Sequence, residues 1–454
     1  MNGRSFPLRR SLRALLLAGA VAQATPAAAL ERQEIETTLA AAMTQVVNQY
    51  VDPLDAGALT VRGLRALGAL PEAAAPSRQA EGITPQTRIL AGEILRFGDG
   101  APREAALDAA LRGMMTGLDP YSRVASRAEL APPPASVGLE LSIRDGALTV
   151  VRPLPGGPGE QAGIQAGDIL TRVDGRATAG LPLPEAVALL RGAPGTRPML
   201  TLRRPGTAGA IMAQPVRGPV QAPPTVRWEL DGAVAVIRNS AFDSRTGGQL
   251  RDAVDAAATR AAAPLAGLVL DLRGNAGGLL DAAEQVAGLA LPEGSVIGSL
   301  RGRAPDNVRA LRARDPLVPR GVPMVVLVDG RTAAGAEIVA AALQDHGRAL
   351  LIGAKTLGAG TIQTVLPLPA GQGALIVTTH RVHRANGARL DGTGVAPDMR
   401  LDEAKRRITV RDDIAADFNG ALAQRVRDAV AGAPAGADVA LLAARAALAH
   451  ATAD

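Results

Sequence analysis

Cysteine is absent from all 454 residues, which excludes disulfides, thiolate zinc sites and a cysteine nucleophile. Aromatic residues make up only 2% of the chain, so its core must be built from Ala, Val, Leu and Ile. Lysine occurs only at Lys355 and Lys405, and the net charge of +6 comes from arginines spread along the chain without a basic block. With so few rings to stack on bases, nucleic-acid binding is disfavoured. We also expect no cofactor and no metal site.

What is present is typical of a soluble globular protein, with 47% apolar and 20% charged residues. The length predicts two or three domains. Beyond the N-terminus, no segment is apolar enough to cross a membrane.

The N-terminus has the three parts of a signal peptide, which we expect over residues 1–29. A charged segment precedes a short apolar run and a small-residue cleavage site. These features are Arg4, Arg9, Arg10 and Arg13, then Ala14–Ala22, then Ala27–Ala29. We therefore expect export to a Gram-negative periplasm. An uncleaved helix that anchors the protein to the membrane is the alternative, and the choice between general and twin-arginine export stays open.

Proline-rich breaks divide the rest of the chain. Helical patterns fill the first part, short strands with glycine-rich turns the second, and alternating strands and helices the third, which indicates a layered α/β domain. The expected parts are a helical region (30–131), a small mostly-β domain (132–222), an α/β domain (223–402) and a C-terminal helical tail (403–454). The tail is expected to pack either on the body or on a second subunit.

The expected elements follow from apolar periodicity. The helices are Glu31–Tyr50, Arg88–Phe97, Arg103–Leu118, Leu183–Leu190, Gly248–Ala262, Leu280–Leu291 and Gly335–Asp345, with two more in the tail within Asp412–Ala449. The strands are Leu139–Ile143, Ala147–Val151, Pro198–Leu202, Val234–Ile237, Leu265–Leu272, Met324–Val328 and Ala349–Ile352. Val173-Asp174-Gly175 is expected to form a tight turn.

Five motifs in order resemble those of the C-terminal processing, or tail-specific, serine peptidases. They are Leu118-Asp119-Pro120-Tyr121-Ser122, Val137-Gly138-Leu139-Glu140-Leu141, Ala162 to Gly175, Asp271-Leu272-Arg273-Gly274-Asn275-Ala276-Gly277-Gly278, and Gly394-Val395-Ala396-Pro397-Asp398. The resemblance covers residues from about 40 to 400. It implies an α/β (α+β) peptidase domain of the ClpP/crotonase-like type, with an inserted PDZ domain and an N-terminal helical region.

A PDZ domain adds a peptide tail to a sheet edge and holds the terminal carboxylate on loop amides. Gly138 suits such a loop, because side chains would block a concavity lined by N–H groups. The expected peptide-binding residues are Val137, Gly138, Leu139, Leu141, Val187 and Leu190. An ordinary small β module with a glycine turn is the alternative.

Alanine stands at both positions where the family keeps its catalytic dyad. The nucleophilic serine lies three residues before a glutamate, here Glu337, so its position is Ala334; the general-base lysine position is Ala359, and the helper glutamine is Gln363. A methyl group can neither attack a carbonyl nor take up a proton. The resemblance implies oxyanion donors at Gly277 or Gly278 together with Gly335, since backbone N–H groups would survive the loss.

These observations predict an exported, catalytically inactive homologue that binds the C-terminal tails of exported proteins. The alternatives are an active enzyme with relocated residues, such as a Thr332–Lys355 pair or a base at His380 or His383, and a PDZ scaffold or adaptor for an active paralogue. We expect Thr332 to cap a helix and Lys355 to be solvated. Natural and engineered loss of the dyad both remain open, as does a homodimer through the terminal helices.

Overall fold

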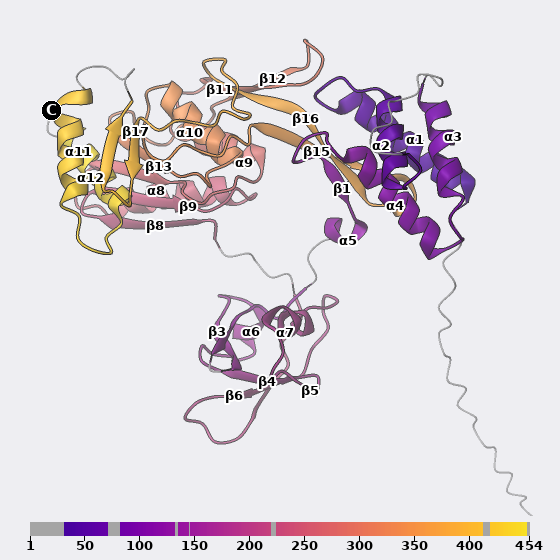
Figure 1. The fold of residues 1–454 in the computed structure, drawn as a ribbon. Helices are drawn as coiled ribbons and strands as arrows, with labels where there is room; N and C mark the ends of the chain where they lie inside the picture. The colour runs from indigo at the N-terminus through magenta and orange to yellow at the C-terminus, as the bar shows by residue number, and fades with distance from the viewer. Residues whose placement is uncertain are drawn as a thin grey trace, which may run out of the picture.

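The computed structural model describes residues 31–70, 82–131, 135–144, 146–218, 224–411 and 418–451. The predicted signal peptide lies outside the described residues. Along the chain follow a helical region, a small β domain and a larger α/β domain (Figure 1). No helix within the described residues is both long and apolar enough to span a bilayer.

Four helices form the N-terminal region. Asp55 caps the second helix by accepting a hydrogen bond of 2.7 Å from the amide of Ala58. The second helix was not predicted, and the third begins five residues before its predicted start at Arg88. The elements are α1 (Arg32–Gln49), α2 (Ala56–Ala66), α3 (Ile83–Ile94) and α4 (Ala101–Met115), followed by β1 (Arg123–Ala125) and the short α5 (Arg127–Leu130).

The small domain is an antiparallel sheet in the order β2-β3-β4-β6-β7, with β5 paired to β4. Strand β2 is an edge strand and lies against helix α7. The expected tight turn is present, with positive φ at both Asp174 and Gly175. The elements are β2 (Leu139–Arg144), β3 (Ala147–Pro153), α6 (Pro158–Gln161), β4 (Ile169–Val173), β5 (Arg176–Ala177), α7 (Leu183–Leu190), β6 (Leu200–Arg203) and β7 (Ile211–Ala213).

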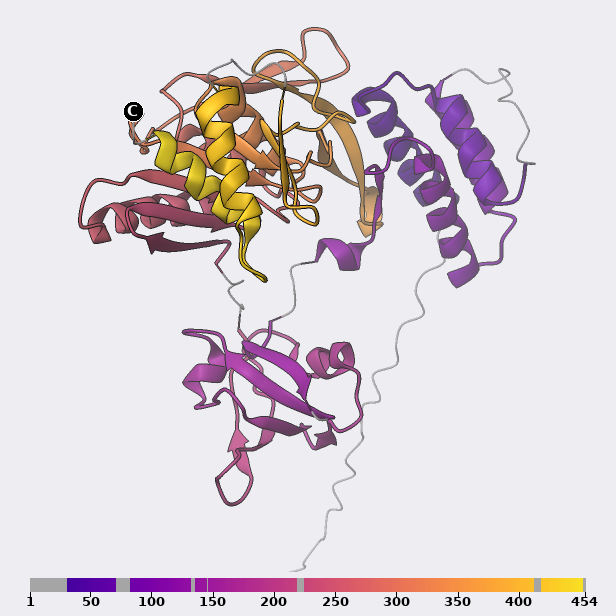
Figure 2. The same ribbon diagram turned by 60° about the vertical axis from the view of Figure 1, so that its left-hand side comes forward.

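The chain enters and leaves this domain at one place. Ser136 and Gly218 form an antiparallel bridge in which each amide donates to the other residue's carbonyl at 3.0 Å. Figures 1 and 2 both show the domain set apart from the rest of the molecule. The domain is therefore an insertion whose ends are joined.

A seven-stranded sheet in the order β18-β17-β14-β13-β10-β9-β8 forms the centre of the α/β domain. Its inner strands are parallel and its two edge strands antiparallel. The strands are β8 (Val226–Asp231), β9 (Val234–Asn239), β10 (Gly267–Asp271), β13 (Met324–Val328), β14 (Leu350–Gly353), β17 (Met399–Asp402) and β18 (Arg407–Val410). Since β18 pairs with β17, this sheet extends beyond the predicted boundary at residue 402.

Helices cover both faces of that sheet. Alternate strand residues point to opposite sides, so Leu268 and Leu270 contact one helix layer, whereas Val269 contacts the other. The first layer is α8 (Thr246–Arg260), α9 (Leu280–Gly288) and α10 (Gly335–Asp345). The second is α11 (Ala423–Ala431) and α12 (Val439–Ala451), preceded by a π-helical turn, η2 (Phe418–Leu422). The C-terminal tail thus packs on its own chain, in yellow in Figure 2.

A second sheet, in the order β1-β16-β11-β12 with β15 on the other side of β16, was not predicted. Its long hairpin reaches the N-terminal helices (Figure 1), where Leu366, Leu375 and Val377 join their core. The strands are β11 (Val296–Arg301), β12 (Val308–Arg312), β15 (Thr361–Pro367) and β16 (Ala374–Arg384), and the 3₁₀ turn η1 (Pro369–Gly371) closes the hairpin.

Candidate functional site

The backbone at Ala334 has a conformation that residues other than glycine seldom adopt. Ala334 is the N-cap of α10 and has φ 48° and ψ −116°, and such conformations cost about 1–3 kcal/mol. Ala334 is partly exposed, whereas Ala333 and Gly335 on either side are buried. The turn therefore presents whatever side chain stands at position 334 at the head of the helix.

The glycine pair after β10 passes directly beside this turn. A Cβ atom on Gly277 would lie 2.7 Å from the Cβ of Ala334, and one on Gly278 would collide with the carbonyl oxygen of Phe242. Both glycines have positive φ, of 98° and 139°. Asn275 ties the two segments together, because its carbonyl accepts a 2.9 Å hydrogen bond from Ala333. Only glycine fits this close approach.

The three predicted oxyanion donors are not equivalent. The amide of Gly277 already donates to the side-chain oxygen of Asn275 at 2.8 Å, so it is not free for a ligand. For the amides of Gly278 and Gly335, no acceptor is recorded among the described residues. Of the predicted choice between Gly277 and Gly278, the geometry favours Gly278.

Glu337 connects the nucleophile position to the base position. This fully buried carboxylate lies in the first turn of α10. One of its oxygens, Oε2, accepts from the amide of Ala334 at 2.9 Å and from the amide of Ala359 at 2.8 Å. The two backbone nitrogens therefore cannot be farther apart than the sum of these lengths. The other oxygen, Oε1, accepts from the amide of Gly358 at 2.7 Å and from the hydroxyl of Thr356 at 2.5 Å.

Gln363 lies on β15, four residues past the base position, and belongs to a polar network. Its Nε2 donates to the hydroxyls of Thr361, at 2.8 Å, and Thr378, at 3.3 Å. Thr378 in turn donates to Asp119, which also accepts from the hydroxyl of Ser122. The motif at residues 118–122 precedes the inserted domain in the sequence and Gln363 follows it, yet the two lie close together in the structure.

The structure disfavours the relocated Thr332–Lys355 pair. Thr332 is fully buried, and its hydroxyl donates to the carbonyl of Leu272 at 3.0 Å. It does not cap α10, as the sequence had suggested, because Ala334 is the N-cap; it closes the preceding turn by accepting from the amide of Asp329. Lys355 is exposed to solvent.

The two histidines of β16 are partly buried. Burial, and then the charge of Arg309, lower the pKa of His380, and burial followed by Arg301 lowers that of His383. His380 contacts the hydroxyl of Thr379 at 2.8 Å. No ion pair to a carboxylate is recorded for either ring among the described residues, so neither histidine forms part of a charge-relay arrangement.

In the small β domain, Gly138 has φ 69°, and a Cβ atom added to it would lie 3.2 Å from the side chain of Pro158. Val137 and Leu190 are buried in the domain core, so their side chains are not exposed to a ligand. The predicted residues Leu139, Leu141 and Val187 are only partly buried and remain on the β2–α7 side. Of the predicted side chains, only these three keep an exposed surface, and their role in binding stays a prediction.

Two contributions to the site were not predicted. In the sequence, Glu337 was used only to locate position 334, although a carboxylate that is buried at a helix start has few possible roles. The network of Asp119, Ser122 and Thr378 joins residues more than 250 positions apart, which no local pattern reveals.

Comparison with known proteins is in accord with this geometry. A model of peptidase family S41 matches residues 233–401, and a PDZ domain model matches residues 149–204. The carboxy-terminal-processing protease of Bartonella bacilliformis is 32% identical over 334 residues, which cover 68% of this chain and 75% of that protein. The carboxy-terminal processing protease CtpA of Bacillus subtilis is 31% identical over 305 residues, which cover 65% of this chain and 64% of that protein.

The chain belongs to the C-terminal processing peptidases of family S41 and carries their PDZ domain. Among solved structures, the photosystem II D1 C-terminal processing protease is similar, with 27% identity and a TM-score of 0.47. The similarity covers 81% of this chain and 93% of that one. The predicted family and mixed α/β fold are confirmed.

Proposed function

We propose that this protein is a catalytically silent C-terminal processing peptidase that binds peptide tails without cutting them. The observation that carries the proposal is the pair of alanines, Ala334 and Ala359, held together by Glu337 in an otherwise complete frame. The strained turn, the glycine pair and Gln363 are all present. The hydroxyl and the amine are missing.

The chemistry of the family requires both absent groups. The serine hydroxyl attacks the carbonyl carbon of the scissile bond, and the lysine amine, kept neutral by burial, removes its proton. The amides of Gly278 and Gly335 still suit a carbonyl oxygen, since backbone donors do not depend on side chains. Binding and an oxyanion hole alone leave a residual acceleration of about 10³–10⁴ over water, too little for useful peptide hydrolysis.

Tail binding rests on the exposed edge of β2. An extended peptide added there would pair with unused backbone groups, while the loop at Gly138 receives its carboxylate and the partly exposed Leu139, Leu141 and Val187 receive its side chains. The tails of exported proteins are the proposed partners, in keeping with the signal-peptide pattern of residues 1–29. An adaptor role for an active paralogue uses the same groove.

The test is to rebuild the dyad. We expect wild type to bind a loosely folded protein with an apolar C-terminus and leave its mass unchanged on long incubation. Ala334→Ser with Ala359→Lys should cleave it at least about 10²-fold faster than wild type, since a positioned general base contributes roughly that factor or more. Mass spectrometry of the products measures both results.

The matched control is Ala334→Ser with Ala359→Met, which fills the space of lysine without an amine and should stay inactive. Cleavage by wild type that survives repurification and persists with protease inhibitors would overturn the proposal. Inactivity of the Ser/Lys variant, with its fold intact, would show that the frame itself has changed.

A further inference from the structure

Strand β8 is one edge of the large sheet, and its outer side is unpaired. The strand order of the sheet ends at β8, and among the described residues no isolated bridge involves this strand. In Figure 1 it runs along the lower border of the α/β domain. Free N–H and C=O groups on the open side of an edge strand can pair with a further strand. Strand β8 therefore offers a surface on which another strand fits.

Hydrogen bonds at the start of β8 show which of its backbone groups point outwards. The amide of Ser240, just after β9, donates to the carbonyl of Thr225 at 2.9 Å, so the backbone of residue 225 faces β9. The amide of Val226 instead donates to the side chain of Gln249 at 3.2 Å. In an antiparallel pair, successive residues direct their backbone groups alternately toward the partner strand and away from it. The backbone groups two and four residues after Val226 therefore also point away from β9.

The side chains of β8 differ in chemistry between the two faces of the sheet. Val226, Trp228 and Leu230, whose backbone groups point outwards, pack on the helix layer that contains α8. Arg227 and Glu229 lie on the opposite face, where they line a hollow beside α12. The open edge thus carries apolar side chains on one face and, one residue apart, a charge of each sign on the other.

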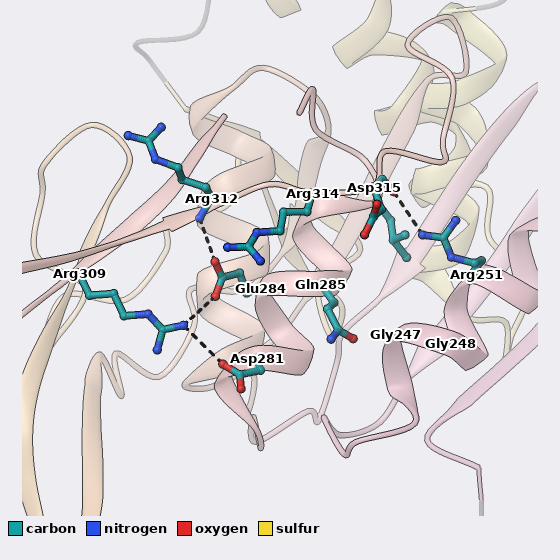
Figure 3. A pocket seen from close by; sticks show the side chains of 11 residues that line it. Gly247, Gly248, Arg251, Asp281, Glu284, Gln285, Arg309, Arg312, Arg314 and Asp315 are labelled. Carbon is teal, nitrogen blue, oxygen red and sulfur yellow. Dashed lines mark hydrogen bonds and ion pairs between the residues drawn. The ribbon is translucent and has the colours of Figure 1, made fainter. Parts of the chain in front are cut away.

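The two charges of this edge have no partner in their own chain. Arg227 and Glu229 are exposed, and no ion pair is recorded for either within the described parts of the chain. The other helix layer shows the contrast: Arg309 lies 3.5 Å from Asp281 and 3.3 Å from Glu284, so it compensates two carboxylates of α9 (Figure 3). The charges on β8 are therefore free to pair across an interface.

A second copy of β8 satisfies both charges in one register. When two identical strands pair antiparallel about a two-fold axis, the residue on the axis stands opposite itself. An axis at Arg227 sets two arginines opposite each other, and an axis at Glu229 sets two glutamates opposite each other; like charges directly opposite are destabilising. An axis at Trp228 sets Arg227 of each copy opposite Glu229 of the other. Axes nearer the ends of the strand leave fewer residues paired.

We propose that two copies of this protein form a two-fold dimer by pairing their β8 strands antiparallel, centred on Trp228. The outward amides of Trp228 and Leu230 then donate to the carbonyls of Trp228 and Val226 in the other copy. Arg227 and Glu229 of opposite copies form two ion pairs, at positions where the Cα atoms of paired strands approach to about 4.5 Å. The two large sheets thereby become one continuous sheet.

The proposed interface is small, because each copy contributes one strand of six residues. Small interfaces belong to weak, reversible complexes, so we expect an equilibrium between monomer and dimer. The chain reaches β8 from the PDZ domain at Pro224, four residues before the axis. At about 3.4 Å per residue, the two Pro224 residues lie roughly 27 Å apart, so the PDZ domains join the paired strands at opposite ends. The dimer depends neither on tail binding nor on the missing dyad.

Sedimentation velocity of the full-length protein at increasing concentration tests the dimer. Arg227→Glu places glutamates opposite each other at both ion pairs, and Glu229→Arg places arginines there, so each should raise the dissociation constant about tenfold or more. The double variant Arg227→Glu with Glu229→Arg exchanges the charges and should restore the dimer. The fluorescence of Trp228, at the axis, should change with concentration in wild type and in the double variant.

Arg427→Glu is the matched control, since it reverses one exposed arginine on α11 and should leave the dimer intact. A wild type that stays monomeric at every concentration overturns the proposal. So does a dimer that the single β8 variants leave intact, or one that Arg427→Glu dissociates, because either result places the interface elsewhere, such as on the terminal helices. Failure of the double variant to recover the dimer, with its fold verified by circular dichroism, contradicts the register.

Discussion

At the scale of single residues, Glu337 contributes most to the site after the two alanines. Its two oxygens accept four hydrogen bonds, three of them buried, from donors in two separate segments. Removing a buried acceptor leaves its donors unsatisfied, each at a cost of about 1–3 kcal/mol. The frame around Ala334 and Ala359 therefore depends on this carboxylate for stability whether or not the dyad is present.

We expect Glu337→Gln to lower the free energy of unfolding of the α/β domain by about 2–4 kcal/mol, because an NH₂ group would then face backbone donors. Urea unfolding followed by the fluorescence of Trp228, the only tryptophan, measures this. The exposed Glu403→Gln is the control and should change stability by less than about 0.5 kcal/mol. Equal stability of the two variants would contradict the linking role of Glu337.

Motif spacing alone assigned Ala334, Ala359 and Gln363 to the nucleophile, base and helper positions, because a motif fixes positions along the chain, and these roles stay predictions. It could not predict that one carboxylate oxygen binds both segments, since Glu337 and Ala359 lie 22 residues apart and meet through a turn. The sequence also could not decide whether the amide of Gly277 or that of Gly278 is the oxyanion donor. Only the position of the Asn275 side chain distinguishes their amides.

At the scale of elements, hydrogen bonds just after the C-terminal end of α1 connect it to other segments of the protein. The hydroxyl of Tyr50 donates to the carbonyl of Leu118 at 2.7 Å, and the amide of Val51 donates to the carbonyl of Thr378 on β16. Burial, with smaller contributions from Asp119 and Asp52, raises the pKa of Tyr50 to about 12. The folded protein thus favours the neutral phenol.

This shift predicts a loss of stability in alkali. A raised pKa means that the stabilisation is complete below the unfolded value near 10 and is lost as pH rises toward about 12. Wild type should lose up to about 3 kcal/mol from this group over that window. Tyr50→Phe cannot titrate, so its stability relative to wild type should rise between these pH values in urea unfolding. A difference that stays constant with pH would refute the assignment.

Elements defined by strong local patterns were predicted at their observed bounds, namely α7, β13 and α10. The second sheet was missed for a physical reason. Strand β16 contacts the N-terminal core at one end and the α/β core at the other. Its apolar residues therefore face two different cores and do not follow the single alternating pattern by which a strand is predicted. Helix α2 is short and rich in Ala and Gly, so its apolar periodicity is weak. Packing against α3 and α4 stabilises it instead.

At the scale of the whole molecule, the described residues form separate hydrophobic cores. The core of the PDZ domain contains only residues from that domain, whereas the cores on the two faces of the large sheet share its strands. A domain with its own core and few connections unfolds as its own unit. Calorimetry should therefore resolve a separate transition for the PDZ domain.

Leu200→Ala tests this independence. Leu200 is fully buried in the PDZ core, and such a truncation costs about 2–5 kcal/mol, which should lower the transition temperature of this domain by roughly 10 °C or more. The transition reported by Trp228 should not move. Met212→Ala, at an exposed position of the same sheet, should leave both unchanged. A single transition that shifts with Leu200→Ala would show instead that the parts unfold together.

The joined ends of the inserted domain have a consequence for its ancestry. Ser136 and Gly218 are hydrogen-bonded neighbours, so both connections to the inserted domain leave from one place. Recombination can therefore exchange the inserted domain without disturbing β8 or the helices before the domain. Under the proposed function, selection could therefore change which tails this domain binds without altering the α/β domain that carries positions 334 and 359.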